Sequence, residues 1–294
     1  MQRERVINSD IHQISEYSSV TDFEAGTVRA GISTIYSGGL PIDLLVSPGA
    51  SDTTIFFFHG AIERHFTLPV LSGLGISGGL EANRVFISDP SLVLDEGLLL
   101  GWYAGNHKQP ELQQSLVRIF NKIITSLHSK RTVFFGGSGG GFASLYFASH
   151  FQSSLALVFN PQTNISKYSQ LAVQDFAEKA FQVESNYNDP ISKLPSQVTS
   201  NLCKVYKTRT NTKIAYIQNL NDQTHIDSHL RPFSQEIHAA NELLLLKKPW
   251  QNGHSPPPKS LLTEVLNLAV SSNNWIQDFS RMGFTRVTNT TQAN

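Results

Sequence analysis

Two short runs of the sequence are apolar at every position, and they restrict the fold more than any other feature. The runs are residues 55–58, with the sequence IFFF, and residues 133–135, with the sequence VFF. Strands that are apolar on both faces are typical of a parallel sheet that helices cover on each side. β-rich runs recur along the chain, at residues 26–36, 41–47, 53–58, 84–88, 132–135, 155–159, 213–218 and 242–246.

Helix-length segments separate several of these runs. Residues 111–127 carry apolar side chains at a helical spacing, and 142–151 and 261–269 also favour helices. Strands that alternate with helices predict an α/β protein, a three-layer α/β/α sandwich with a mostly parallel sheet. We expect a single domain over residues 1–294. Residues 160–210 are rich in Asn, Ser and Gln, and they are predicted to be a small polar cap insertion.

Composition narrows the possible partners and the location. Lys and Arg (23) balance Asp and Glu (23), so no general field attracts the chain to nucleic acid or acidic membranes. Cys203 is the only cysteine, which excludes an intramolecular disulfide and a cysteine-based zinc site. No stretch of sequence approaches the roughly 20 apolar residues that span a bilayer. The N-terminal sequence lacks an apolar signal-peptide core, so we expect a soluble, cytoplasmic protein without a membrane span.

A serine between glycines directly follows one of the apolar runs. Residues 136–140 have the sequence GGSGG, and a helical segment begins just after them. A serine at a sharp strand-to-helix turn has a strained backbone and an exposed hydroxyl group. The N–H of Gly139 then points to the place where a tetrahedral oxyanion forms, and the helix N-terminus adds positive potential. Ser138 is therefore predicted to be the nucleophile of acyl-group chemistry.

This turn resembles the nucleophile turn of the α/β-hydrolase superfamily, and the resemblance extends over about residues 40–275. In that family a strand that ends in His-Gly precedes the second oxyanion donor. Here the β run 53–58 is followed by His59, Gly60 and Ala61. The resemblance implies that the N–H of Ala61 or Ile62 is this donor, and that His59 orients the loop.

The resemblance also implies an acid after a late strand and a base after the last strand. Asp222 follows the run 213–218, with Asp227 as the alternative, and a helix N-cap is the other role for either carboxylate. His254 follows the run 242–246 and fits the position of the general base. His225 and His229 are too close to Asp222 in sequence to fit the family's chain order. The implied triad is Ser138, Asp222 and His254, with the carboxylate fixing the tautomer of the histidine.

Three other patterns are interpreted as structural. Residues 75–79 repeat the G-x-S-x-G pattern, but no β run leads into them, so we expect Ser77 to be a loop residue. Residues 73–78 match a dinucleotide fingerprint but leave no room for its helix before the next β run. His225 and His229 are four residues apart, but without an H-E-x-x-H pattern a polar surface is favoured over a metal site. No cofactor and no metal are expected.

Three stretches are similar to hydrolase-like proteins of bacterial capsular-polysaccharide synthesis and accessory glycoprotein secretion systems: 86–92, 100–106 and 218–233. This resemblance implies a glycan or its O-acyl group as substrate. Trp102 and Tyr103 would then be a platform on which a sugar stacks, with core or rim packing as the alternative role.

The predicted function is that of a serine hydrolase, similar to carboxylesterases, which acts on a small-molecule or glycan ester through an acyl-enzyme intermediate. A sugar or polysaccharide O-acyltransferase with the same triad is the first alternative. A non-catalytic binding or scaffold protein with the same fold is the second. The sequence leaves the substrate and the oligomeric state open.

Overall fold

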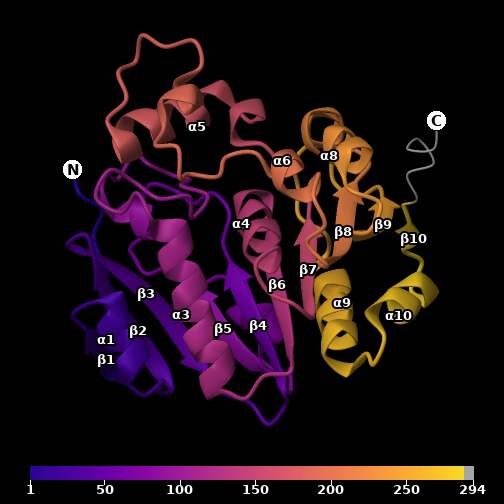
Figure 1. Cartoon of the computed structure of the whole chain (residues 1–294), viewed down its shortest axis with the longest axis horizontal. Coiled ribbons are helices and arrows are strands. Elements are labelled where there is room, and N and C mark those ends of the chain that lie inside the picture. The colour runs from indigo at the N-terminus through magenta and orange to yellow at the C-terminus, as the bar shows by residue number, and fades with distance from the viewer. Residues whose placement is uncertain (288–294) are drawn as a thin grey trace.

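The computed structural model describes residues 1–287, and within them ten strands form a single sheet (Figure 1). Residues 288–294, which the sequence assigns to the same domain, lie outside the described part. The strands are β1 (Ile14–Tyr17), β2 (Gly31–Ser37), β3 (Leu40–Ser47), β4 (Thr53–Phe58), β5 (Asn83–Ile87), β6 (Arg131–Gly137), β7 (Ser154–Phe159), β8 (Lys213–Asn219), β9 (Glu242–Lys248) and β10 (Thr285–Arg286). Their order across the sheet is β1-β2-β3-β5-β4-β6-β7-β8-β9-β10.

The middle of the sheet is parallel. Strands β5, β4, β6, β7, β8 and β9 each run parallel to their neighbours in this group, whereas β3 pairs antiparallel with β5 and β10 antiparallel with β9. The prediction of a mostly parallel sheet is therefore confirmed. The predicted run 26–36 begins as a strand only at Gly31, because Gly26 caps the preceding helix. Strands β1 and β10 are short edge strands that the sequence did not indicate.

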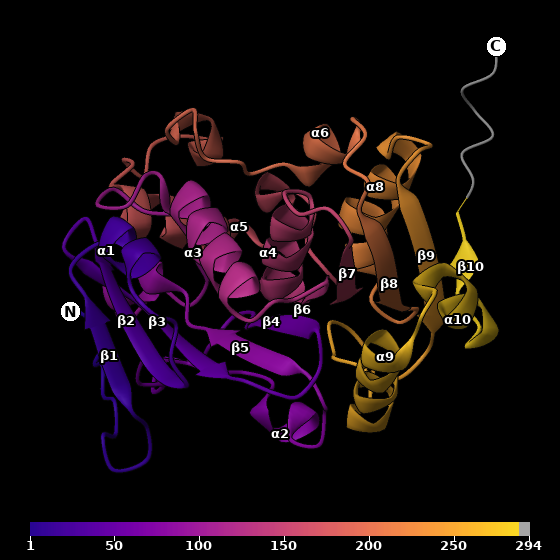
Figure 2. The same cartoon turned by 60° about the horizontal axis from the view of Figure 1, so that its bottom comes forward.

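Helices cover both faces of the sheet. They are α1 (Val20–Ala25), α2 (Leu74–Ser77), α3 (Leu112–Ser126), α4 (Ser138–Ala148), α5 (Gln170–Asp175), α6 (Leu202–Tyr206), α7 (Gln223–His225), α8 (Arg231–Glu236), α9 (Lys259–Ser271) and α10 (Trp275–Arg281). Figure 2 shows α3 and α4 on one side of β4 and β6, with α2 and α9 on the other. This is the predicted three-layer arrangement.

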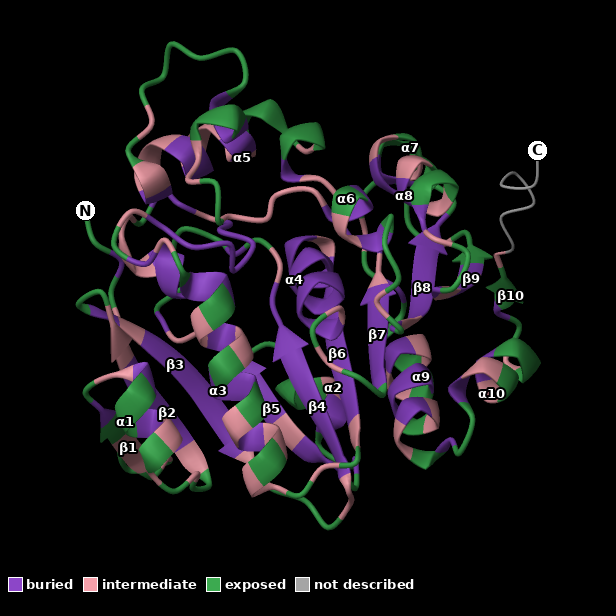
Figure 3. Ribbon diagram, viewed as in Figure 1, coloured by how far each residue is buried: buried purple, intermediate pink, exposed green. Residues whose placement is uncertain are grey.

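The apolar core is divided between the two faces because successive residues of a strand point in opposite directions. Phe56 of β4 packs with Phe120 of α3 on one face, at a ring-centroid distance of 4.6 Å. Phe57 lies in the cluster on the other face, together with Leu266 of α9. Figure 3 shows the central strands buried almost throughout. A strand that contributes to two cores has no polar face, which explains the continuous apolar runs of the sequence.

Residues 160–210 connect β7 to β8. They contain η2 (Ile165–Lys167), α5, η3 (Phe176–Ala180), η4 (Pro190–Lys193) and α6, and an isolated bridge joins Asn164 to Asn201. In Figure 1 this segment lies beyond the end of the sheet to which the arrows of β4 and β8 point. In open α/β sheets this carboxyl edge is where ligands bind.

Within residues 1–287, the helices are all too short or too polar to cross a membrane.

Candidate active site

Ser138 lies where β6 ends and α4 begins, at the carboxyl edge of the sheet. Its φ angle is +55°, in the left-handed region that non-glycine residues rarely occupy. Strand and helix approach each other closely at this turn. A Cβ atom on Gly136 would lie 2.4 Å from the carbonyl oxygen of Gly140, so a larger residue would separate the two elements. The turn therefore holds Ser138 in a strained backbone conformation.

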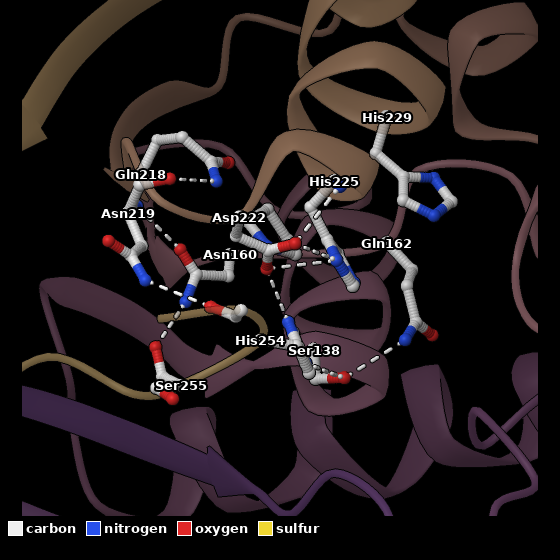
Figure 4. Close-up of polar contacts among 12 residues, drawn as sticks. Ser138, Asn160, Gln162, Gln218, Asn219, Asp222, His225, His229, His254 and Ser255 are labelled. Atoms are coloured by element: carbon white, nitrogen blue, oxygen red, sulfur yellow. Dashed lines mark hydrogen bonds and ion pairs between the residues drawn. The ribbon is translucent and has the colours of Figure 1, made fainter. Parts of the chain in front are cut away.

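Ser138, His254 and Asp222 form a continuous hydrogen-bonded chain (Figure 4). Ser138 Oγ lies 2.9 Å from His254 Nε2, and His254 Nδ1 lies 2.7 Å from Asp222 Oδ2. Asp222 follows β8, and His254 lies in the loop between β9 and α9. The structure thus brings together the three residues that chain order selected, at distances suited to proton transfer.

Two asparagines hold the loop that carries His254. Asn219, the last residue of β8, donates from Nδ2 to the carbonyl oxygens of Gln251 (2.8 Å) and Gly253 (3.0 Å). Asn160 donates to the carbonyl oxygen of Ser255 at 2.7 Å and accepts from the N–H of Asn219 at 2.8 Å. Both are buried at the ends of neighbouring parallel strands. Neither asparagine was predicted from the sequence, although each is a polar residue at the carboxyl end of an apolar run.

Asp222 has a second histidine partner, His225. The Nδ1 atom of His225 lies 3.0 Å from Asp222 Oδ1, and its ring stacks on that of His254 at a centroid distance of 3.8 Å and an angle of 8°. Burial raises the pKa of Asp222, but hydrogen bonds from His254 and His225 outweigh it and hold this pKa below its usual value. Asp222 is therefore an ionised carboxylate that both imidazoles contact.

His225 and His229 do not form a polar surface, so that interpretation is wrong. Their exposed fractions are 2% and 0%. Burial, reinforced by neighbouring histidine charge, lowers the pKa of His225 to about 4 and that of His229 to about 3, so both rings are neutral. Asp222, His225 and His254 place potential metal ligands within 4.8 Å of one another. The hydrogen bonds of Asp222 account for this grouping, and the absence of a metal stays a prediction.

Two backbone N–H groups border Ser138. Gly139 is the second residue of α4, so its N–H has no partner within the helix. The loop after β4 lies beside it, since a Cβ atom on Gly60 would come within 3.4 Å of Ser138 Cβ. Ala61 is exposed, and within residues 1–287 its N–H donates no hydrogen bond. The N–H of Ile62 donates to the carbonyl oxygen of Leu99 at 2.9 Å, so the Ile62 alternative is wrong.

His59 fixes this loop. Its Nδ1 lies 2.7 Å from the carbonyl oxygen of Gly60, and its Nε2 accepts from the N–H of Asp89 at 3.0 Å. Burial lowers the pKa of His59 to about 4, so the ring is neutral and can use one nitrogen as donor and the other as acceptor. The position of the Ala61 N–H therefore depends on a buried histidine.

Trp102 and Tyr103 are not exposed, and the prediction that they are a sugar-stacking platform is wrong. Each is 1% exposed. The Tyr103 hydroxyl accepts from the N–H of His59 at 3.0 Å and donates to the carbonyl oxygen of Ile87 at 2.9 Å, so it supports the same loop. The Trp102 ring packs against Phe176, at a centroid distance of 5.1 Å. Both residues are core aromatics, the alternative that the sequence left open.

Gln162 contacts Ser138 directly, a contact that was not predicted from the sequence. Its Nε2 donates to Ser138 Oγ at 2.9 Å, and its Oε1 accepts from Trp102 Nε1. An indole N–H can only donate, so the amide oxygen must face Trp102 and the amide nitrogen must face Ser138. Gln162 lies beyond the end of β7, and no spacing pattern indicated that its side chain returns to Ser138.

Ser77 lies at the end of α2 rather than in a loop, so that expectation is wrong. Its side chain is buried, and its hydroxyl donates to the carbonyl oxygen of Gly73 at 2.8 Å. A buried hydroxyl group that is already hydrogen-bonded does not serve as a nucleophile.

A cavity of about 540 Å³ opens at Ser138 and His254. It also borders the loop 59–61, α2 and the beginning of α9. Its volume lies within the range of small-molecule sites in proteins.

No protein-family model matches the chain, and no curated protein sequence matches it. Solved structures do match, and they show an α/β-hydrolase-like fold. The capsule O-acetyltransferase of Neisseria meningitidis serogroup A has a TM-score of 0.59 and 15% identity, over 86% of this chain and 99% of that one. Carboxyl esterase 2 from the fungus Tuber melanosporum has a TM-score of 0.51 and 14% identity, over 88% and 92%.

A third match is the Gap123 glycosylation-associated complex of Streptococcus agalactiae. Its TM-score is 0.51 at 15% identity, over 83% of this chain and 44% of that one. The fold is therefore shared with esterases and with proteins of capsule and glycosylation systems, as the sequence resemblance implied.

The buried histidines predict how stability depends on pH. His59, His225 and His229 have folded-state pKa values of about 4, 4 and 3, against 6.5 in the unfolded chain. These histidines bind protons more readily when the chain is unfolded. Their contribution to the free energy of unfolding is therefore full above pH 6.5 and is lost as the pH falls toward 4. Asp89 acts oppositely, because burial raises its pKa to about 6. We expect unfolding near pH 5 to take up about two protons net.

The measurement is the urea unfolding free energy between pH 5 and pH 7. The N–H of Thr163 donates to His229 Nδ1 at 3.3 Å. In the variant His229→Asn the amide oxygen can accept this hydrogen bond, but the side chain does not bind a proton in this pH range. This variant is expected to reduce the proton uptake by about one. An unchanged slope in a folded variant would show that His229 is not neutral in the native protein.

Proposed function

We propose that the protein is a serine hydrolase that cleaves an acyl ester through a covalent acyl-enzyme on Ser138. One observation carries this proposal: the chain from Ser138 Oγ to His254 Nε2 (2.9 Å) and from His254 Nδ1 to Asp222 Oδ2 (2.7 Å). His254 takes the proton of Ser138 as Oγ attacks the acyl carbon. The N–H groups of Gly139 and Ala61 stabilise the oxyanion, and Asp222 stabilises the imidazolium.

The tetrahedral intermediate then collapses. His254 gives its proton to the leaving oxygen, and the acyl group stays on Ser138. Water attacks this acyl-enzyme with His254 as the base, which releases the acid and restores the serine. The ionised state of Asp222 supports this assignment, because a negative carboxylate stabilises the positive charge that develops on the His254 ring.

Gln162 has a defined part in this mechanism. Since its amide nitrogen donates to Ser138 Oγ, the serine hydroxyl directs its own proton to His254 Nε2. The same amide stabilises Oγ whenever it carries negative charge, on attack and again as the leaving group of deacylation. Gln162 and Tyr168, which borders the cavity, both belong to residues 160–210. Their position supports the proposal that this segment is a cap over the site.

Replacing Gln162 with alanine is expected to lower kcat about ten- to hundredfold, with a small change in KM. A hydrogen bond to a charged group contributes about 1.5–3 kcal/mol, and Oγ is charged only during reaction. Gln162→Glu should reduce kcat more, since a carboxylate cannot donate to Ser138 Oγ. Gln197→Ala, at an exposed position of the same segment, is the matched control. The measurement is steady-state kinetics on p-nitrophenyl acetate. An unaltered kcat in Gln162→Ala would show that Gln162 takes no part in the reaction.

A sugar or polysaccharide O-acyltransferase is the second candidate. The likeness to the capsule O-acetyltransferase, which covers 99% of that chain, favours it. Hydrolysis and transfer share the acyl-enzyme and differ in the hydroxyl that attacks it. The test is labelling by a fluorophosphonate probe with mapping of the modified peptide, followed by ester turnover with and without a capsule-type oligosaccharide. Transfer predicts an acylated sugar at the expense of free acid. Absence of both labelling and turnover would favour a non-catalytic protein.

A further inference from the structure

A row of phenylalanine rings leads away from the nucleophile along one face of the sheet. Phe57, Phe135 and Phe159 lie on β4, β6 and β7, and ring centroids of neighbours are 5.5 and 5.6 Å apart. The row begins beside Ser138, because the Phe159 ring packs against Gly137, the residue that precedes the serine. A Cβ atom on Gly137 would lie only 2.0 Å from this ring. All three rings border the cavity that opens at Ser138.

The remaining walls of this cavity are also largely apolar. Ile76 of α2 and Leu262 of α9 belong to the same apolar cluster as the phenylalanine rings, and Pro256 and Pro257 also line the cavity. Among the described residues that line the cavity none is Asp or Glu, and Lys259 is the single lysine or arginine. These walls are suited to a hydrocarbon chain and offer no carboxylate to a cationic group.

The cavity is much larger than an acetyl group requires. A methyl group is about the size of a water molecule, whose share of liquid volume is roughly 30 Å³. The cavity measures about 540 Å³. An acetyl group on Ser138 would leave most of it empty, whereas each further methylene group that enters gains up to about fourfold in binding.

We propose that this cavity is the acyl-chain site of the enzyme, and that its preferred substrates carry an unbranched apolar acyl group of four or more carbons rather than acetyl. The inference rests on the proposed function, because the chain reaches the site as an ester whose carbonyl carbon lies at Ser138 Oγ. The acyl chain runs along Phe159, Phe135 and Phe57 between α2 and α9. The alcohol part of the ester leaves on the side of His254, which protonates it.

Two series of esters test this assignment on the whole chain. In the first, p-nitrophenol is constant and the acyl group is acetyl, butanoyl or octanoyl. We expect kcat/KM to rise at least tenfold from acetyl to octanoyl. In the second, the acyl group is acetyl and the alcohol is lengthened, with an expected change below threefold. A preference for acetyl, or a rise confined to the alcohol series, would overturn the proposal.

Gly75 offers a steric probe of the same site. It lines the cavity, and a Cβ atom on it would meet no atom within 4 Å. Gly75→Trp is expected to lower kcat/KM for the octanoyl ester at least tenfold more than for the acetyl ester. Gly79 also has no atom within 4 Å of a Cβ atom but does not line the cavity, so Gly79→Trp is the matched control. Equal losses on both esters with Gly75→Trp would contradict an acyl-chain site.

A second variant guards against a folding defect in Gly75→Trp. Ile76→Ala enlarges the cavity from the same helix and is expected to shift the preference toward dodecanoyl over octanoyl by at least threefold. An unchanged preference would count against the site. Failure of the proposed function is distinguishable, because it means no probe labelling of Ser138 and no turnover of any ester. Failure of this inference alone leaves Ser138 labelled and acetyl the best substrate.

Discussion

Replacing Ser138 with alanine is expected to abolish labelling by a fluorophosphonate probe and to lower ester turnover by about 10⁵- to 10⁶-fold. The change removes the atom that attacks the acyl carbon and leaves His254 and Gln162 without their common partner. Stability should change little, because the Oγ atom hydrogen-bonds only within the site among the described residues. Kinetics, intact-protein mass spectrometry after labelling, and a thermal melt form the measurement.

Two further variants make this result specific. Ser138→Gly should be as inactive as the alanine variant but more stable, by about 1 kcal/mol or more, because glycine adopts the φ angle of +55° without strain. Ser77→Ala should keep full activity and lose about 1 kcal/mol of stability, since it removes one buried hydrogen bond to Gly73. Full turnover by folded Ser138→Ala, or complete inactivation by Ser77→Ala, would refute the choice of nucleophile.

The fold was predictable because strands that are buried on both faces of a parallel sheet are apolar at every position. Runs such as 55–58 and 133–135 have no polar face, and this pattern has few other solutions. The edge strands β1 and β10 were missed because they are short, and because β1 is partly exposed and β10 is exposed, so neither has an apolar pattern. The parts of the fold that sequence predicts well are those where local pattern and tertiary burial coincide.

The grouping of Ser138, Asp222 and His254 could be anticipated because the carboxyl ends of parallel strands meet at one edge, and chain order then limits the choices. The exposure of individual side chains could not be predicted in this way. Trp102 and His225 are buried by segments distant in sequence, so a platform and a polar surface were wrongly inferred. Gln162 is held at Ser138 by its backbone N–H, which donates to the carbonyl oxygen of Ser138 at 3.1 Å, and by Trp102, which donates to its amide oxygen. Trp102 is 60 residues away in sequence, so no local pattern predicts this contact.

Replacing His254 with alanine is expected to lower kcat by several orders of magnitude, up to about 10⁶-fold. Ser138 Oγ then lacks the base that takes its proton at 2.9 Å. His225 cannot replace it, because its Nδ1 is held by Asp222 and its ring is buried. His225→Ala should cost far less, because it removes a stacking contact with His254 and leaves the triad hydrogen bonds in place. An essential His225 with a dispensable His254 would reverse this assignment.

The catalytic role of Asp222 can be separated from its capping role, because the backbone of α7 and the His254 ring contact different oxygens, although His225 Nδ1 lies 3.0 Å from both. Oδ1 accepts from the backbone N–H of His225, the last residue of the short helix α7, and Oδ2 accepts from His254 Nδ1. Asp222→Asn keeps the first contact but presents a donor to the second, so kcat should fall about 10³- to 10⁴-fold while α7 stays capped. Combined with His254→Ala it should add almost nothing, since the two residues act as one unit. Additive losses in the double variant would assign Asp222 to capping and leave His254 to act alone.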